Sequence, residues 1–124
     1  MKNRIPRAAA AVLKKCTPCS GVRALGIKEA RAYIQEMPEW RLSADARSIR
    51  TEYVMQDFMA AIDLIRRIAR SAETEGHHPD IHLTAYRRLG IELSTHSLSG
   101  LSENDFILAS KISALPKKLK SRTI

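Results

Sequence analysis

The chain has 124 residues, 44% of them hydrophobic and 27% charged, and a formal net charge of +8. This length suits one domain, and the balance of apolar and charged residues is that of a folded protein rather than a disordered one. The uncharged apolar run from Ala8 to Leu13 is far shorter than the roughly 20 residues that cross a bilayer, so we expect no membrane span.

The positive charge is concentrated at the two ends of the chain. Residues 1–28 and 111–124 contain no acid, whereas all 13 acids lie within 29–110 together with nine arginines. A domain that grips phosphate usually carries its basic residues on one folded face. Charge in the terminal segments therefore argues against a nucleic-acid partner.

Residues 1–24 are interpreted as a basic, flexible arm. An acid-free basic start is also typical of organelle-targeting peptides, although this one lacks their serine enrichment. We therefore expect a cytoplasmic protein, with a mitochondrial or other organellar location as the alternative. A secretory signal is disfavoured by the short apolar run.

The arm contains the motif CTPC, formed by Cys16 and Cys19. A CxxC motif indicates redox chemistry when it follows a strand and opens a helix, but Ser20 and Gly21 open none here. A zinc site would need two further ligands, and the chain has no second CxxC motif. The pattern favours two thiols in a loop.

Regular elements begin near Lys28. Apolar residues at helical spacing predict a helix over 28–37 that Pro38 ends. Short strands over 40–43 and 48–55 follow and would pair as a hairpin. The second strand alternates, and its buried face would carry Ile49, Thr51, Tyr53 and Met55.

The most regular pattern is the helix over 57–75, whose apolar residues cover an arc of roughly 160° on a helical wheel. Asp57 suits its start and Gly76 its end. Strands over 80–86 and 88–95 follow. A last helix over 101–115 begins at the cap Ser102, and Asp105 three residues later forms a variant of the capping box.

The order is α-β-β-α-β-β-α. Two hairpins separated by a helix predict an α+β fold, with a four-stranded antiparallel sheet and helices packed on one face. The domain would span 25–115, followed by a basic C-terminal tail over 116–124. Because the long helix and the last helix have more apolar surface than one sheet face needs, we also expect a homo-oligomer, either a dimer or a tetramer.

The histidines indicate the site. His77 and His78 follow the long helix, where Pro79 forces the chain out of helical geometry, and His96 follows the last strand. Imidazoles that meet carboxylates at element ends suit general acid–base chemistry. The carboxylates in reach are Glu73 and Asp105.

Other interpretations of these residues stay open. The histidine pair could simply end a helix, Asp105 could be only a cap, and Glu73 could be a solvated residue. His82 alternates to the polar face of its strand and is interpreted as a surface residue. A metal site is disfavoured because the chain has neither an HxH nor an HExxH motif.

The spacing of Glu73, the run His77-His78-Pro79, Tyr86, His96 and Asp105 resembles the signature of the pterin-4a-carbinolamine dehydratases. The similarity extends over roughly 25–115 and includes PEW at 38–40 and STHSLSGLSENDFILASKI at 94–112. The family's order of helices and strands agrees with the one predicted above.

The resemblance implies a dehydratase that removes water from 4a-hydroxytetrahydropterin to give quinonoid dihydropterin, in support of tetrahydrobiopterin recycling. It assigns acid–base catalysis to His77, His78 and His96, with support from Glu73, Pro79 and Asp105, and it requires no metal or organic cofactor. It also leaves two alternatives: a non-catalytic dimerisation and transcriptional coactivator module, or an enzyme acting on another pterin, such as one in molybdenum-cofactor metabolism.

Overall fold

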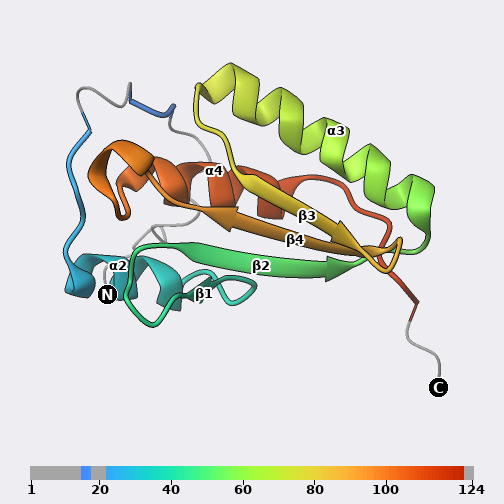
Figure 1. Ribbon diagram of the computed structural model, residues 1–124, viewed down its shortest axis with the longest axis horizontal. Helices are drawn as coiled ribbons and strands as arrows, with labels where there is room; N and C mark the ends of the chain where they lie inside the picture. Colours follow the sequence, from blue (N-terminus) through green and yellow to red (C-terminus); the bar gives the residue numbers. More distant parts are fainter. Residues whose placement is uncertain (1–14, 18–21, 122–124) are drawn as a thin grey trace, which may run out of the picture.

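The computed structural model describes residues 15–17 and 22–121. Its elements follow the predicted order (Figure 1): α2 (Ile27–Gln35), β1 (Arg41–Leu42), β2 (Ile49–Val54), α3 (Phe58–Glu75), β3 (Asp80–Thr84), β4 (Arg88–Leu93), the short 3-10 helix η2 (His96–Leu98) and α4 (Glu103–Ala114). The four strands form one antiparallel sheet in the order β1-β2-β4-β3. The predicted α+β fold is therefore confirmed.

The two central strands, β2 and β4, build the core face of the sheet. They pair from Ile49 opposite Leu93 to Val54 opposite Arg88. Their alternate side chains enter one apolar core together with residues of α3 and α4. The strands contribute Ile49, Tyr53, Leu89, Ile91 and Leu93, and the helices contribute Ala61, Leu64, Ile68, Phe106, Leu108 and Ile112.

The caps of α3 place the chain that follows it. The Asp57 carboxylate accepts the N–H of Ala60 at 2.8 Å, and Gly76 ends the helix in the left-handed region at φ 65°. A residue with a Cβ is strained at that φ, so glycine suits this reversal. The chain therefore leaves α3 sharply, and His77 begins the return toward the sheet.

All four strands are shorter than predicted: β1 and β2 each lose one residue at either end, and β3 and β4 each end two residues early. β3 ends at Thr84 rather than at residue 86, because Ala85 and Tyr86 have φ values of 46° and 53° and form the turn into β4. β4 ends at Leu93 rather than at residue 95, and Thr95 instead forms an isolated bridge with Gly100. Period-two alternation continued through both positions in the sequence, so it could not reveal these turns.

Both terminal segments contribute to the folded unit. Ala24 forms an isolated bridge with Ser102, and residues 15–17 contact α3 and α4. At the other end, the tail pairs with the outer edge of β2, where Gln56 N–H donates to Lys118 O and Lys120 N–H donates to Val54 O, each at 2.9 Å. Within the described ranges, no helix combines the length and apolar character needed to cross a bilayer.

Candidate active site

His77 lies beneath the surface against the first turn of α4. Its side chain is 5% exposed, and Nε2 lies 2.6 Å from Oδ1 of Asp105, which is fully buried. Gly76 turns the chain toward α4 at this point, and α3 and α4 pack against each other. The reversal after α3 thus brings together two residues that are 28 positions apart in the sequence.

The other oxygen of Asp105 is held by two donors. Oδ2 accepts the Thr95 hydroxyl at 2.8 Å and the Ser102 backbone N–H at 2.9 Å. The Thr95 and Ser102 hydroxyls are themselves 2.7 Å apart. Asp105 is therefore both the predicted capping residue and the partner of His77. A carboxylate with three polar neighbours is held in one orientation, and it holds the imidazole in turn.

His78 forms a second imidazole–carboxylate pair, but in solvent. Its Nε2 lies 2.5 Å from Oε2 of Glu73, and the two side chains are 61% and 77% exposed. The adjacent histidines therefore face different surroundings and different carboxylates. The half-buried Pro79 follows them and leads directly into β3.

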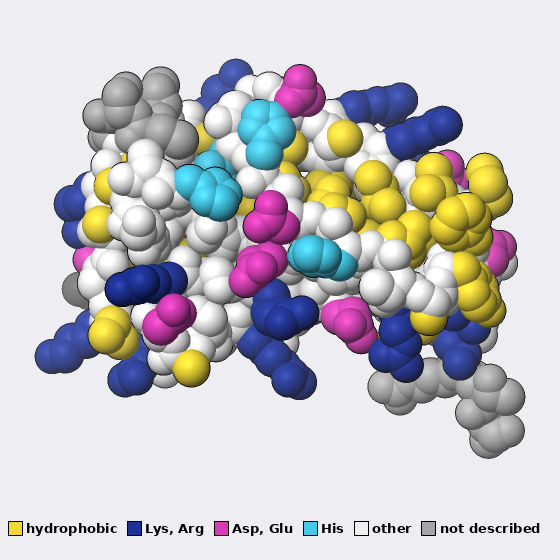
Figure 2. Space-filling view, in the orientation of Figure 1, with side chains coloured by type: hydrophobic (Ala, Val, Ile, Leu, Met, Phe, Trp, Pro, Cys, Tyr) yellow, Lys and Arg dark blue, Asp and Glu magenta, His cyan; other side chains and the backbone are white. Residues whose placement is uncertain are grey.

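His96 is exposed at the start of η2, and within the described residues its side chain has no hydrogen-bond partner. Its neighbour Thr95 ties this segment to Asp105. His82 is exposed on β3, as the alternation predicted. Histidine and carboxylate side chains lie close together on the face of the molecule shown in Figure 2.

The part of the chain that contains these histidines and carboxylates matches a known protein family. The family model for pterin 4 alpha carbinolamine dehydratase matches residues 23–115, which include both imidazole–carboxylate pairs. The chain belongs to this family. The predicted hydro-lyase class is thereby confirmed at the level of the family.

Individual proteins that are similar to this chain support the same family assignment. A protein of Arabidopsis thaliana named pterin-4-alpha-carbinolamine dehydratase 2, mitochondrial, is 40% identical over 106 residues, which cover 82% of this chain and 57% of that protein. A relative from Halorhodospira halophila with the same family name is 41% identical over 103 residues and is covered to 94%. A Brucella melitensis crystal structure, described as a transcriptional coactivator/pterin dehydratase, superposes with a TM-score of 0.70 at 28% identity, over 74% of this chain and 97% of that one.

Thr95 and Ser102 complete the Asp105 network, and sequence reasoning assigned neither of them to the site. The sequence indicates Ser102 only as a helix cap and Thr95 only as a strand residue. Thr95 directly precedes His96 and has a hydroxyl that can form hydrogen bonds. Nothing in the sequence, however, indicates that this hydroxyl points toward α4. The structure shows this orientation in the hydrogen bond from the Thr95 hydroxyl to Oδ2 of Asp105.

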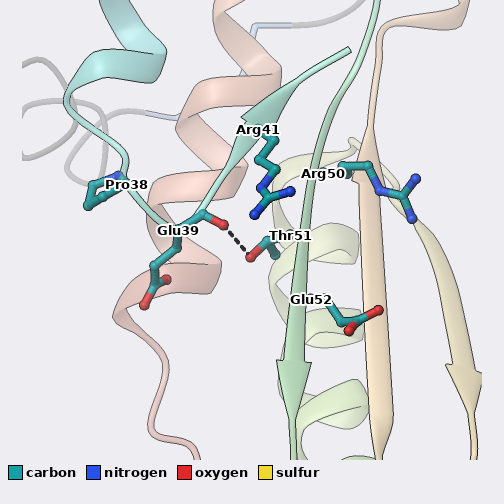
Figure 3. A pocket seen from close by; sticks show the side chains of 6 residues that line it. All are labelled: Pro38, Glu39, Arg41, Arg50, Thr51 and Glu52. Carbon is teal, nitrogen blue, oxygen red and sulfur yellow. Dashed lines mark hydrogen bonds between the residues drawn. The ribbon is translucent and has the colours of Figure 1, made fainter.

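Among the described residues, neither a metal cluster nor a hollow beside the sheet competes with the histidine site as defined by His77, His78 and His96. No group of three or more metal-ligating side chains gathers in the described part of the chain. A hollow of about 500 Å³ lies beside β1 and β2 and is lined by Pro38, Glu39, Arg41, Arg50, Thr51 and Glu52 (Figure 3). It contains none of the predicted site residues, and its charges are of both signs.

Cys16 has the properties of a protected thiol. Burial, with Glu75 beside it, raises its pKa from about 9 to about 12, so the thiolate is strongly disfavoured at neutral pH.

We expect iodoacetamide at pH 8 to modify Cys16 roughly 10²-fold or more slowly in the native protein than in urea. Peptide mass spectrometry distinguishes it from Cys19, which lies outside the described residues. Equal rates in the two states would show that the thiol is not protected.

Proposed function

We propose that this protein catalyses the dehydration of 4a-hydroxytetrahydropterin by histidine general acid–base catalysis. In this reaction the 4a hydroxyl leaves as water after protonation, and N5 of the pterin loses its proton, which gives the quinonoid dihydropterin. One group must donate a proton and another must accept one. Imidazole can do either near neutral pH. Formation of the quinonoid dihydropterin would support tetrahydrobiopterin recycling.

The observation that carries the proposal is the buried His77–Asp105 pair. Because a carboxylate occupies Nε2, the neutral imidazole carries its proton there and presents Nδ1 as the basic nitrogen. Glu73 would act in the same way on His78. His96, with no partner among the described residues, would complete a set of three imidazoles, and Pro79 would fix the backbone between the first two and β3.

The chemistry uses no redox change and creates no strongly charged intermediate, so we propose that it needs neither a metal nor an organic cofactor. Purified protein should accelerate the dehydration in the presence of a chelator. Activity that chelation abolishes and zinc restores would instead indicate a metal enzyme.

A binding module is the second candidate function, because the Brucella structure is described as both coactivator and dehydratase. A coactivator without catalytic activity would not use the acid–base chemistry of the His77–Asp105 pair in this chain. An enzyme that acts on another pterin, including one of molybdenum-cofactor metabolism, would use the same pair. Rates measured with different 4a-hydroxypterins would separate these possibilities.

We propose that the protein forms a dimer or a tetramer through α3 and β3. Phe58, at the start of the predicted apolar arc of α3, is 50% exposed, and Met59 and Tyr86, which lie outside that arc, are 64% and 56% exposed. Figure 2 shows hydrophobic side chains gathered over α3 and β3. The apolar residues of α4, in contrast, are buried within the chain, so α4 offers no such surface.

Sedimentation of the wild-type protein should therefore give a mass of two or four chains. Phe58→Glu should shift the equilibrium toward the monomer, because an interface would have to bury the added charge unpaired. Arg67→Glu, on the polar side of α3, is the matched control and should leave the mass unchanged. A wild-type monomer at micromolar concentration would contradict the proposal.

We propose a cytoplasmic location and keep an organelle as the alternative. The Arabidopsis relative is named as mitochondrial, and the basic, acid-free start of this chain is compatible with import. The residues concerned, 1–14, lie outside the described part of the structure. Cell fractionation, with and without fusion of these residues to a reporter, distinguishes the two locations.

A further inference from the structure

Residues 15–17, which we call the N-terminal strap, bind beside the proposed site. Cys16 N–H donates to Oε1 of Glu75 at 2.8 Å, where α3 ends. Thr17 is bound at both ends of its backbone by one side chain: its N–H donates to Oδ1 of Asn104 at 2.9 Å, and its carbonyl accepts from Nδ2 of Asn104 at 2.6 Å. Figure 1 shows the strap beside the C-terminal end of α3. The strap precedes the family match, which begins at residue 23.

The two anchors of the strap flank the reacting pair. Glu75 is two residues before His77, and Asn104 directly precedes Asp105. Asn104 is only 1% exposed, so its buried amide needs a hydrogen-bond partner within the protein, and the backbone of Thr17 is that partner. The strap thus connects the end of the helix that leads to His77 with the first turn of the helix that carries Asp105.

Glu75 also joins the two helices directly. Its side chain is 4% exposed, and its second oxygen accepts from Nζ of Lys111, on α4, at 2.7 Å. Burial alone would raise the pKa of Glu75, but Lys111 and the Cys16 N–H together lower it. The carboxylate is therefore held ionised between α3, α4 and the strap.

From this geometry we infer that the N-terminal strap is a positioning element for the reaction, and that Glu75 and Asn104 are the positioning residues through which it acts. The inference rests on the proposed catalytic role of His77. Without the strap, the ends of α3 and α4 would lose a shared set of hydrogen bonds, and the contact between His77 and Asp105 would be less well fixed. A displacement of about 1 Å at a reacting group can cost roughly 10²-fold in rate.

The test uses the full chain and two variants that release the strap from opposite sides. Thr17→Pro removes the N–H that Asn104 binds, whereas Asn104→Leu removes the amide but keeps a side chain of similar size. Thr17→Ala is the matched control, because the contacts with Asn104 use only the backbone of residue 17. We expect kcat to fall about tenfold in the two releasing variants, with KM changed by less than about twofold, and to stay at the wild-type value in the control.

The double variant Thr17→Pro/Asn104→Leu should be no slower than Asn104→Leu alone, since Thr17→Pro removes one of the two hydrogen bonds that Asn104→Leu already removes. The imidazole ¹⁵N signals of His77 should shift in the releasing variants, while those of the exposed His82 stay in place. A purely structural role would lower the melting temperature without moving the His77 signals or kcat. If Asn104→Leu does not fold, Thr17→Pro and its control still decide the question.

Two outcomes separate the strap from the proposed function. If His77→Gln loses activity but the releasing variants keep wild-type kcat and unshifted His77 signals, the strap has no positioning role and the proposed function stands. If His77→Gln is fully active, the proposed function itself fails, and a fall in kcat on release of the strap could not be attributed to His77.

Discussion

Replacing His77 with alanine is expected to lower the rate of 4a-hydroxytetrahydropterin dehydration by roughly 10²-fold or more, the usual contribution of a positioned proton-transfer group. The reason is the geometry of the site, where Asp105 holds Nε2 of His77 at 2.6 Å and fixes the orientation of the ring. Single-turnover rates measured with purified protein and chelator report the chemical step directly.

The burial of His77 requires a second variant in this experiment. His77 lies at an element end, as predicted, but its side chain is only 5% exposed. His77→Ala could therefore lower stability as well as rate. His77→Gln keeps a side-chain donor that can reach Asp105 but has no titratable ring, so it should remain folded and be as slow as the alanine variant.

Two comparisons complete the test. His82→Ala removes an exposed imidazole from β3 and should leave the rate unchanged. His78→Ala and His96→Ala should each cost activity, if the three imidazoles act together. Full activity in the His77→Gln/His78→Ala double variant would remove the catalytic proposal and favour the binding module.

The sequence was sufficient to predict the order of the elements because each one has a local signal. The clearest is α3, where an apolar stripe lies between the cap Asp57 and the terminator Gly76, and the structure confirms both ends. The inward face of β2 likewise follows from alternation alone. Where the local signal was ambiguous, as at Ala85 and Tyr86, strand and turn could not be distinguished.

Contacts between distant segments could not be predicted in this way. The pairing of Lys118 and Lys120 with β2 uses backbone groups, which leave no pattern in the sequence. Lys117 was interpreted as part of a basic tail, yet its ammonium donates to the carbonyls of Ile112, Ser113 and Leu115 at the end of α4. Such a contact supplies hydrogen-bond partners to the last carbonyls of the helix, which have none within it. A lysine that follows a helix in the sequence is only a weak indication of this contact.

For the candidate site, too, the sequence predicts some features and not others. The sequence predicts that His77 and Asp105 lie at element ends, but not that one is buried against the other while His78 and Glu73 remain in solvent. Adjacent residues usually face different ways, and the turn at Gly76 decides which of the two histidines faces inward. The resulting contact joins residues that are 28 positions apart, and no local pattern encodes it.

Asp105→Ala is expected to lower both the stability and the rate. The carboxylate is fully buried and accepts from Thr95 and Ser102 besides contacting His77, so alanine would leave several buried polar groups unpaired. Leaving a buried polar group without its partner typically costs about 1–3 kcal/mol. Chemical denaturation at pH 7 should show this loss. Glu73→Ala, which removes the carboxylate of the exposed pair, is the matched control and should leave the free energy of unfolding unchanged within error.

Asp105→Asn separates the two roles of this carboxylate. The amide oxygen can still accept from Thr95 and Ser102, so most of the stability should be retained. Its NH₂ group, however, would then face Nε2 of His77 as a donor, which favours the opposite tautomer of the ring and moves the proton to Nδ1. A histidine held in that tautomer cannot accept a proton at Nδ1. We therefore expect Asp105→Asn to be folded and to be slowed nearly as much as His77→Ala. A folded Asp105→Asn protein with wild-type activity would show that the carboxylate serves only as a helix cap.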